Sequence, residues 1–105
     1  MADQHEHGRQ RRCCRPSQQI TNGDVQAEIV RVPRDSKQCL PATRTDVDVV
    51  LRGEALGARR WDPRHGPDRE RSGRLSVGRD VLERHVRVGE TLTISVDDEG
   101  RVTVT

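Results

Sequence analysis

The sequence has very few aromatic residues. It contains no Phe, no Tyr and a single Trp, Trp61. The large apolar residues are mostly β-branched instead, with thirteen Val and three Ile against six Leu. Side chains of this kind suit the pleated surface of a β-sheet. Because a core built from Val buries little area per residue, we expect modest stability, or stability that is shared with a partner chain.

Long apolar runs and a cysteine framework are also missing. No apolar run approaches the length of about 18 residues that a membrane helix needs, and the N-terminus lacks the apolar stretch of a secretion signal. Three Cys, two of them adjacent (Cys13 and Cys14), do not make a disulfide framework. With 105 residues there is room for one domain. These absences predict a cytoplasmic protein with no membrane partner.

The charge is high but nearly balanced. Charged residues make up 34% of the chain, yet the net charge is +2, which excludes a globally cationic nucleic-acid wrapper. All basic residues but Lys37 are Arg, the residue suited to bidentate phosphate or guanine contacts. GC-rich coding gives the same bias without a physical reason. The positive excess is centred on residues 59–74, which hold six Arg against three acids.

Residues 1–24 are polar and show no periodicity, with Ile20 as their only large aliphatic residue. Such a composition cannot offset the entropy of ordering, so we expect a flexible tail followed by a single domain over residues 25–105. Four side chains in the tail could bind a metal: His5, His7, Cys13 and Cys14. Their spacing fits structural zinc sites poorly. We therefore expect no metal site and no cofactor.

Apolar alternation predicts most strands. Residues 25–32 read as a first strand with a one-residue slip in phase, which indicates a bulge, and Pro33 ends it. A long connection follows at 35–46, in which Cys39, as a small buried apolar residue, and Leu40 reach the core. Residues 47–61 form a hairpin ending in Trp61, the largest expected core side chain. Residues 62–74 are too polar and too broken for anything but a loop.

The last third of the chain has the clearest pattern. A short strand is expected at 75–77 and a short helix at 80–86, in which Asp80 and Glu83 resemble a capping box. Residues 92–96 and 102–104 alternate around an acidic Gly turn and form a hairpin. The whole chain is therefore expected to be mainly β. The predicted fold is a small, partly open β-barrel of about six to seven short strands with one short helix, preceded by a disordered N-terminal tail.

Residues 74–104, "RLSVGRDVLERHVRVGETLTISVDDEGRVTV", resemble the AbrB-type swapped-hairpin module of bacterial transition-state regulators and antitoxins. Over residues 25–104 the order of elements is similar to the DNA-binding pseudobarrel of plant auxin-response factors and EcoRII-type restriction effector domains. The matching pieces are "VRVPRDSKQCLPA", "VVLRGEALGARRW" and the pair Gly89-Glu90. The resemblance implies a pseudobarrel whose strand-joining loops on one side grip the DNA backbone and reach into the major groove.

The function that follows is a DNA-binding module for double-stranded DNA: a transcriptional regulator, an antitoxin-like protein or a recognition domain of a restriction or defence system. Arg-bearing loops on the barrel rim would hold the phosphates. The residues expected to contact DNA are Arg34, Ser36, Lys37, Arg59, Arg60, Arg64, Arg69, Arg71 and Arg74.

Other classes stay open. The alternative is a protein-interaction barrel that recruits a partner through a strand edge, with its Arg loop facing an acidic protein. An enzyme is not expected, since no nucleophile-base pair, carboxylate pair or phosphate-cradling Gly loop stands out. We expect a monomer that dimerises weakly or joins a larger partner protein.

Overall fold

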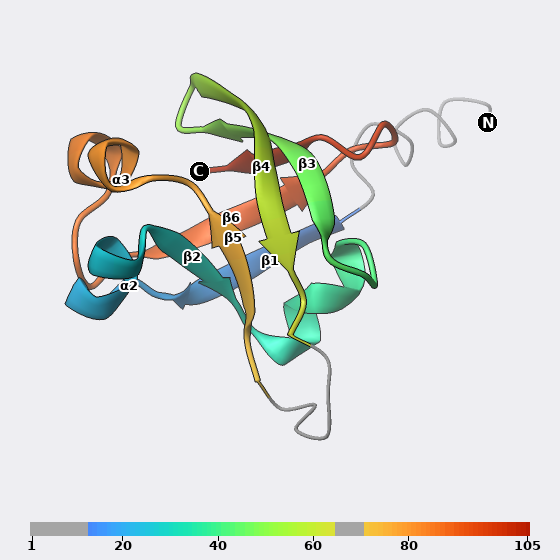
Figure 1. The fold of residues 1–105 in the computed structure, drawn as a ribbon, viewed down its shortest axis with the longest axis horizontal. Helices are drawn as coiled ribbons and strands as arrows, with labels where there is room; N and C mark the ends of the chain where they lie inside the picture. Colours follow the sequence, from blue (N-terminus) through green and yellow to red (C-terminus); the bar gives the residue numbers. More distant parts are fainter. Residues whose placement is uncertain (1–12, 65–70) are drawn as a thin grey trace, which may run out of the picture.

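A single mixed sheet curls into a nearly closed barrel (Figure 1). The structure is a computed structural model that describes residues 13–64 and 71–105. Within these residues the strands are β1 (Cys13–Gln19), β2 (Ile29–Val32), β3 (Thr45–Leu51), β4 (Glu54–Asp62), β5 (Gly73–Ser76), β6 (Thr91–Val96) and β7 (Val102–Val104). The described helices are α2 (Asn22–Ala27), the 3-10 helix η1 (Arg34–Cys39) and α3 (Arg79–His85). The mainly β barrel predicted from the sequence is confirmed.

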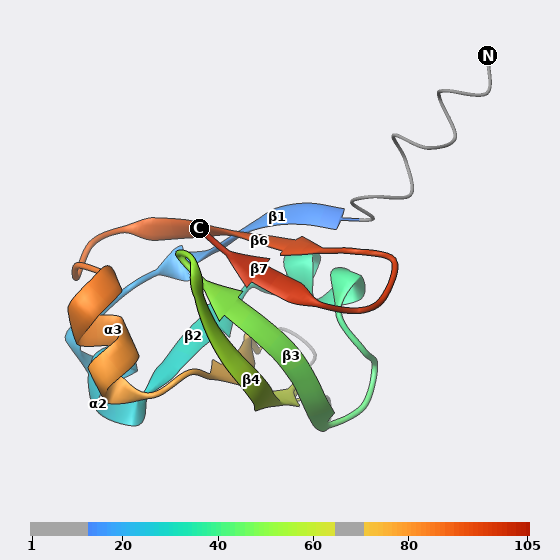
Figure 2. The ribbon, with the colours of Figure 1, turned by 90° about the horizontal axis from the view of Figure 1, so that it is seen from above.

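The strand order is β1-β6-β7-β3-β4-β5-β2, and the neighbours are antiparallel except for the parallel pair of β3 and β7. Figure 2 shows β1, β6 and β7 along one side of the barrel, β2, β3 and β4 along the other, and α2 with α3 at one end. The barrel closes along a seam between β1 and β2. Side chains bridge this seam: Arg31 Nη2 on β2 donates to the Gln19 carbonyl on β1 at 3.1 Å.

The core follows the alternation expected of half-buried strands. On β6, Leu92, Ile94 and Val96 are buried while their neighbours face outward. Trp61 is fully buried, and its Nε1 donates to the Pro41 carbonyl at 2.8 Å, so its one polar atom is satisfied. Leu40 is buried as expected. Both predicted hairpins, β3–β4 and β6–β7, are confirmed.

The prediction of a flexible tail is wrong for residues 13–24; residues 1–12 lie outside the described part. Strand β1 pairs with β6 antiparallel along its length, with one irregularity after Pro16. Ile20 then enters the core with 1% of its surface exposed. The composition argument failed because a strand can satisfy its backbone groups through a neighbour without an apolar face of its own, and one aliphatic side chain is then enough to anchor it.

The expected strand over residues 25–32 is in fact the end of a helix and a shorter strand. Helix α2 ends at Ala27, and Glu28 takes a left-handed conformation (φ 65°) before β2 begins. The slip in apolar phase therefore marks a helix-to-strand junction, not a bulge. Thr21 and Asp24 form a capping box at the start of α2: the Thr21 hydroxyl accepts from the Asp24 amide, and the Asp24 carboxylate accepts from the Thr21 amide.

Helix α3 is present where the sequence predicted it, but without the predicted cap. Its N-cap is Gly78 (φ 103°), which makes no side-chain cap hydrogen bond. No helix in the described residues is both long and apolar enough to span a membrane.

The cysteines also differ from expectation. Cys39 is disulfide-bonded rather than a plain apolar residue, whereas Cys14 is a free, exposed thiol. The number of cysteines in the sequence could not predict this difference, because a count of three does not show which of them form a disulfide.

Gly73 is predicted to be irreplaceable because it lies against the Trp61 ring. A Cβ at Gly73 would overlap the ring and lie 2.8 Å from its Cζ3. We expect Gly73→Ala to lower the free energy of unfolding by about 1–3 kcal/mol through overpacking, measured by urea denaturation. Gly23→Ala is the matched control, because its Cβ would meet nothing closer than 3.6 Å. Equal stability of the two variants would contradict this packing.

Ile20 provides a direct test of the ordered N-terminal segment. Ile20→Ala should reduce the free energy of unfolding by about 2–5 kcal/mol, the usual cost of truncating a buried aliphatic side chain. Val88 is 52% exposed, so Val88→Ala should change the free energy of unfolding by no more than about 0.5 kcal/mol. If Ile20→Ala is as stable as the wild type in chemical denaturation, residues 13–24 do not belong to the fold.

Candidate nucleic-acid interface

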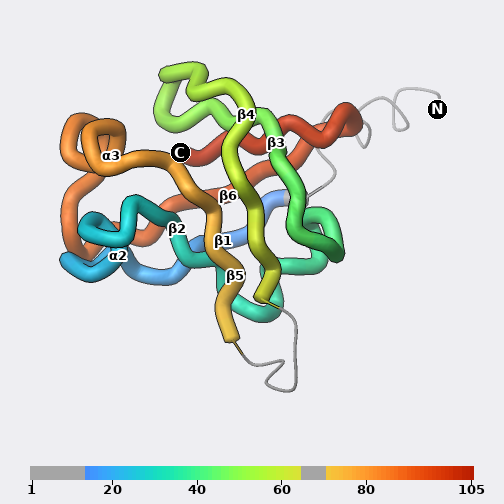
Figure 3. The backbone as a smooth tube through the Cα atoms, in the orientation of Figure 1, coloured from blue at the N-terminus to red at the C-terminus, as the bar shows by residue number. Residues whose placement is uncertain are grey.

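A buried lysine joins the two segments that the sequence selected as DNA-contacting loops. The Nζ of Lys37, on η1, donates to the carbonyl of Pro63 and to the carbonyl of Arg71, both at 2.8 Å. These carbonyls belong to the segment between β4 and β5. Figure 3 shows η1 beside the ends of β4 and β5 at one end of the barrel. The two loops are therefore held together by one ammonium group, which we call the Lys37 bridge.

The bridge also defines what Lys37 and its neighbour Ser36 do. Both residues were expected to contact DNA, yet Lys37 is 7% and Ser36 3% exposed. The Ser36 hydroxyl donates to the Pro16 carbonyl at 3.0 Å and so ties η1 to β1. Their polar atoms face protein carbonyls, so their role here is to position η1. In the sequence, the one feature that pointed to a structural role for Lys37 was its being the single Lys in a chain rich in Arg. A compact ammonium fits between two carbonyls where a planar guanidinium does not.

Three of the expected arginines lie close to the Lys37 bridge. Arg34 begins η1, Arg64 follows the Pro63 carbonyl, and the Arg71 carbonyl is itself an acceptor. Arg34 and Arg71 are exposed, while Arg64 is half-buried. The structure thus brings the bases of these three side chains to one end of the barrel. Arg69 lies outside the described residues.

Local geometry at Arg64 turns the chain as it leaves β4. Arg64 has a left-handed backbone (φ 56°), and its amide donates to the Asp62 carboxylate at 2.9 Å. This is the side-chain turn that Asp favours. The Asp62 carboxylate therefore has a structural partner in the turn, the Arg64 amide.

Arg74 extends the positive surface onto the outer face of β5. It is exposed and lies opposite Arg31 of β2 and Asp62 of β4 in the sheet register. Arg31 is bound to Asp24, with Nε at 2.6 Å from a carboxylate oxygen. Among the described residues, the Arg74 and Arg71 side chains have no hydrogen bond or ion pair, so their guanidinium groups are available to a ligand.

Arg60 and Arg59 point to opposite faces of β4. Arg60 faces outward and pairs with Asp46 of β3 at 3.1 Å, an exposed contact of small energetic value. Arg59 instead lines a cavity beside α3, where its Nε is buried. Of the nine residues selected from the sequence, the structure groups Arg34, Arg64, Arg71 and Arg74 at what we call the loop end, and it separates Arg59 from them.

At the opposite end, near α3, the arginines Arg84 and Arg52 pair with acids. Glu54 accepts hydrogen bonds from Arg84 and lies 2.7 Å from His85 Nε2, and these bonds, that of Arg84 first, lower the pKa of the Glu54 carboxyl. The Arg87 amide and then the Arg52 side chain likewise lower the pKa of Glu90. Because these groups are exposed, the pairs are screened. Arg84 and Arg52 are therefore paired, whereas Arg71 and Arg74 at the loop end have no side-chain partner among the described residues.

The described residues contain no group of three or more His, Cys, Asp or Glu side chains placed to hold a metal ion. Comparison with known proteins gives no match to a family model, a curated protein or a solved structure.

Lys37→Met tests the bridge, because it keeps the length of the side chain but removes its donors. The carbonyls of Pro63 and Arg71 then lose their donor, which costs about 1–3 kcal/mol for each group that water does not reach. We expect lower stability together with faster hydrogen exchange of the Ser36 and Lys37 amides, which bond to Pro33, and little change in the β6–β7 hairpin. Gln38→Met, at the exposed next position, should leave the exchange of η1 as it is. Uniform exchange changes across the barrel would contradict a local role.

Proposed function

We propose that the loop end binds the phosphate backbone of double-stranded DNA. The observation that carries the proposal is the Lys37 bridge, which holds the two Arg-bearing segments side by side at one end of a rigid barrel. Arg guanidinium groups match phosphate oxygens bidentately. Since the barrel fixes the bases of these arginines, less ordering entropy is lost on binding than for the same side chains on a free loop.

The charge distribution supports the same surface. Arg71 and Arg74 have no side-chain partner among the described residues, whereas Arg84 and Arg52 near α3 are paired with Glu54 and Glu90. Asp35, beside Arg34, and Asp62 reduce the net positive potential. A surface of this kind gives moderate, salt-dependent affinity instead of the tight nonspecific grip of a strongly cationic protein.

The resemblance noted in the sequence supports this assignment. In the pseudobarrel family of auxin-response factors and EcoRII-type effectors, strand-joining loops on one side hold DNA, and on this proposal η1 and the β4–β5 connection correspond to them. The biological setting would then be a small regulator, an antitoxin-like protein or a recognition domain of a restriction or defence system.

Salt dependence of duplex binding is the sharpest test. If Arg34, Arg64, Arg71 and Arg74 all contact phosphates, fluorescence anisotropy with mixed-sequence duplex DNA should give a log K against log salt slope of about −3 to −4, from about −0.9 per contact. Arg71→Ala combined with Arg74→Ala should make this slope shallower by about 2. Arg101→Ala is the control, because this exposed arginine lies on the β6–β7 turn.

Two outcomes count against the proposal. One is the absence of binding to any duplex at low salt. The other is that Arg101→Ala makes the slope of log K against log salt shallower by as much as a single substitution at the loop end does. Binding to polyglutamate as tight as binding to DNA would favour the alternative, an acidic protein partner at the same surface.

A further inference from the structure

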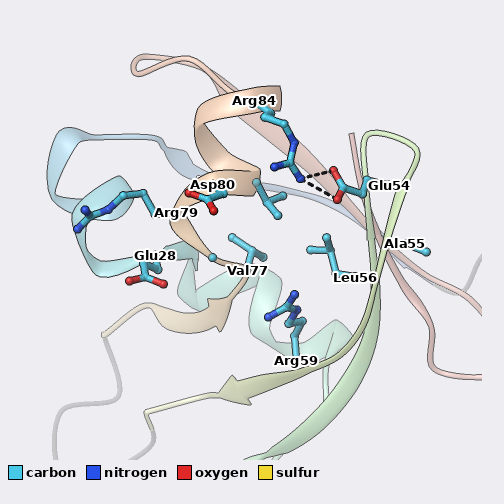
Figure 4. Close-up of a pocket in the computed structure, with 11 residues that line it drawn as sticks. Glu28, Glu54, Ala55, Leu56, Arg59, Val77, Arg79, Asp80 and Arg84 are labelled. Atoms are coloured by element: carbon cyan, nitrogen blue, oxygen red, sulfur yellow. Dashed lines mark hydrogen bonds and ion pairs between the residues drawn. The ribbon is translucent and has the colours of Figure 1, made fainter.

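A cavity of about 610 Å³ lies between β4 and α3, away from the loop end (Figure 4). Its volume is in the range of small-molecule sites. Leu56 and Arg59 of β4 line one side, Val77 lies at its base, and α3 contributes Asp80 and Arg84. Glu28, at the junction of α2 and β2, lines it as well. This cavity takes no part in the proposed DNA contact, so an inference about it stands on its own.

Arg59 is the unusual residue of the cavity. Its Nε is buried and has no hydrogen-bond partner, and among the described residues its guanidinium pairs with no acid. A buried donor without an acceptor is costly and is therefore rare in a folded protein. The guanidinium charge is delocalised, so an anion at its terminal nitrogens compensates the whole group. A carboxylate is the matching planar, bidentate ligand.

The other charges restrict what can accompany that carboxylate. Arg84 is already bound to Glu54, with Nη2 at 2.8 and 2.7 Å from its two carboxylate oxygens. The side chains of Asp80 and Glu28, which also line the cavity, accept no hydrogen bond from any described residue. Arg79 also lines the cavity, but in Figure 4 its side chain extends away from Arg59. Near Arg59 the cavity thus presents an unpaired cation on β4, and on the side of α2 and α3 it presents two open carboxylates beside the outward-directed Arg79.

We propose that this cavity binds a small zwitterion, an amino-carboxylic acid whose carboxylate pairs with Arg59 and whose ammonium group faces Asp80 and Glu28. A simple carboxylate would satisfy Arg59 but would place a second negative charge near two acids. A simple amine would leave the Arg59 guanidinium, with its buried Nε, unpaired. Only a ligand with both charges complements both sides of the cavity.

The test titrates the full chain with defined probes and follows backbone amide signals by NMR. The probes are glycine, γ-aminobutyrate and ε-aminocaproate, each compared with butyrate and butylamine at constant ionic strength. At least one amino acid should shift the Leu56, Arg59, Gly78 and Asp80 amides saturably and bind about tenfold more tightly than butyrate or butylamine, the usual effect of one charge-assisted hydrogen bond.

Variants identify the groups responsible. Arg59→Gln should weaken binding of the amino acid by about tenfold or more. Arg60→Gln is the matched control and should have no effect, because Arg60 is the same residue type on the next position of β4 and faces outward. Asp80→Asn combined with Glu28→Gln should abolish the preference of the amino acid over butyrate. This pair of exposed substitutions keeps the test valid if Arg59→Gln does not fold.

The proposal is overturned if no probe shifts the cavity amides, if butyrate binds the wild type as tightly as every amino acid, or if Arg60→Gln weakens binding as much as Arg59→Gln. The Arg71→Ala and Arg74→Ala double variant, which is expected to bind DNA more weakly, should bind the amino acid as the wild type does. The two proposals can therefore fail independently.

Discussion

The barrel depends on the packing of one indole ring. Trp61 is the only aromatic side chain in the protein, and it is fully buried in a core otherwise made of aliphatic residues. Its ring lies against Gly73, the first residue of β5, and its Nε1 is held by the Pro41 carbonyl. One side chain therefore sets the spacing of β4 and β5 and fixes the connection that leads into β3. A Val-rich core gives little packing area per residue, so the single large side chain carries a disproportionate share of the burial.

The arrangement of the polar groups follows from this closure. Because β4 and β5 are held together by Trp61, the chain segments that leave them start side by side, within reach of Lys37 on η1. The seam between β1 and β2 is likewise spanned by the Arg31 side chain, and the Ser36 hydroxyl ties η1 to β1. Buried or half-buried cations and hydroxyls thus fasten the irregular parts of the barrel, and exposed arginines are left for other contacts. The loop end therefore carries the exposed side chains of Arg71 and Arg74, whereas the end near α3 carries the ion pairs of Glu54 and Glu90.

Sequence patterns correctly predicted the strands that bury one apolar face. They did not predict the strand that lacks such a face. The hairpins of β3–β4 and β6–β7 carry regular apolar alternation, and they lie where expected. Strand β1, "CCRPSQQ", has no such pattern, since its stability comes from backbone pairing with β6, which the sequence of β1 alone cannot reveal. The opposite orientations of Arg59 and Arg60 follow from strand alternation, but nothing in the sequence says that α3 covers the inner one. Local pattern therefore gives the strands, and tertiary packing gives the site.

The position of β7 has a consequence for how the barrel is assembled. Its three residues lie between β6 and β3 and pair with both, antiparallel on one side and parallel on the other. Without β7 the sheet falls into two pieces, β1-β6 and β3-β4-β5-β2. Because β7 follows all other strands in the chain, a growing polypeptide can form hairpins early but cannot join the two pieces until this strand is synthesised. Joining them also requires a long-range contact with β3, which is slow compared with hairpin closure. The pairing of the two pieces therefore rests on the three residues of β7, which cover one edge of β6 and one edge of β3 that would otherwise be open.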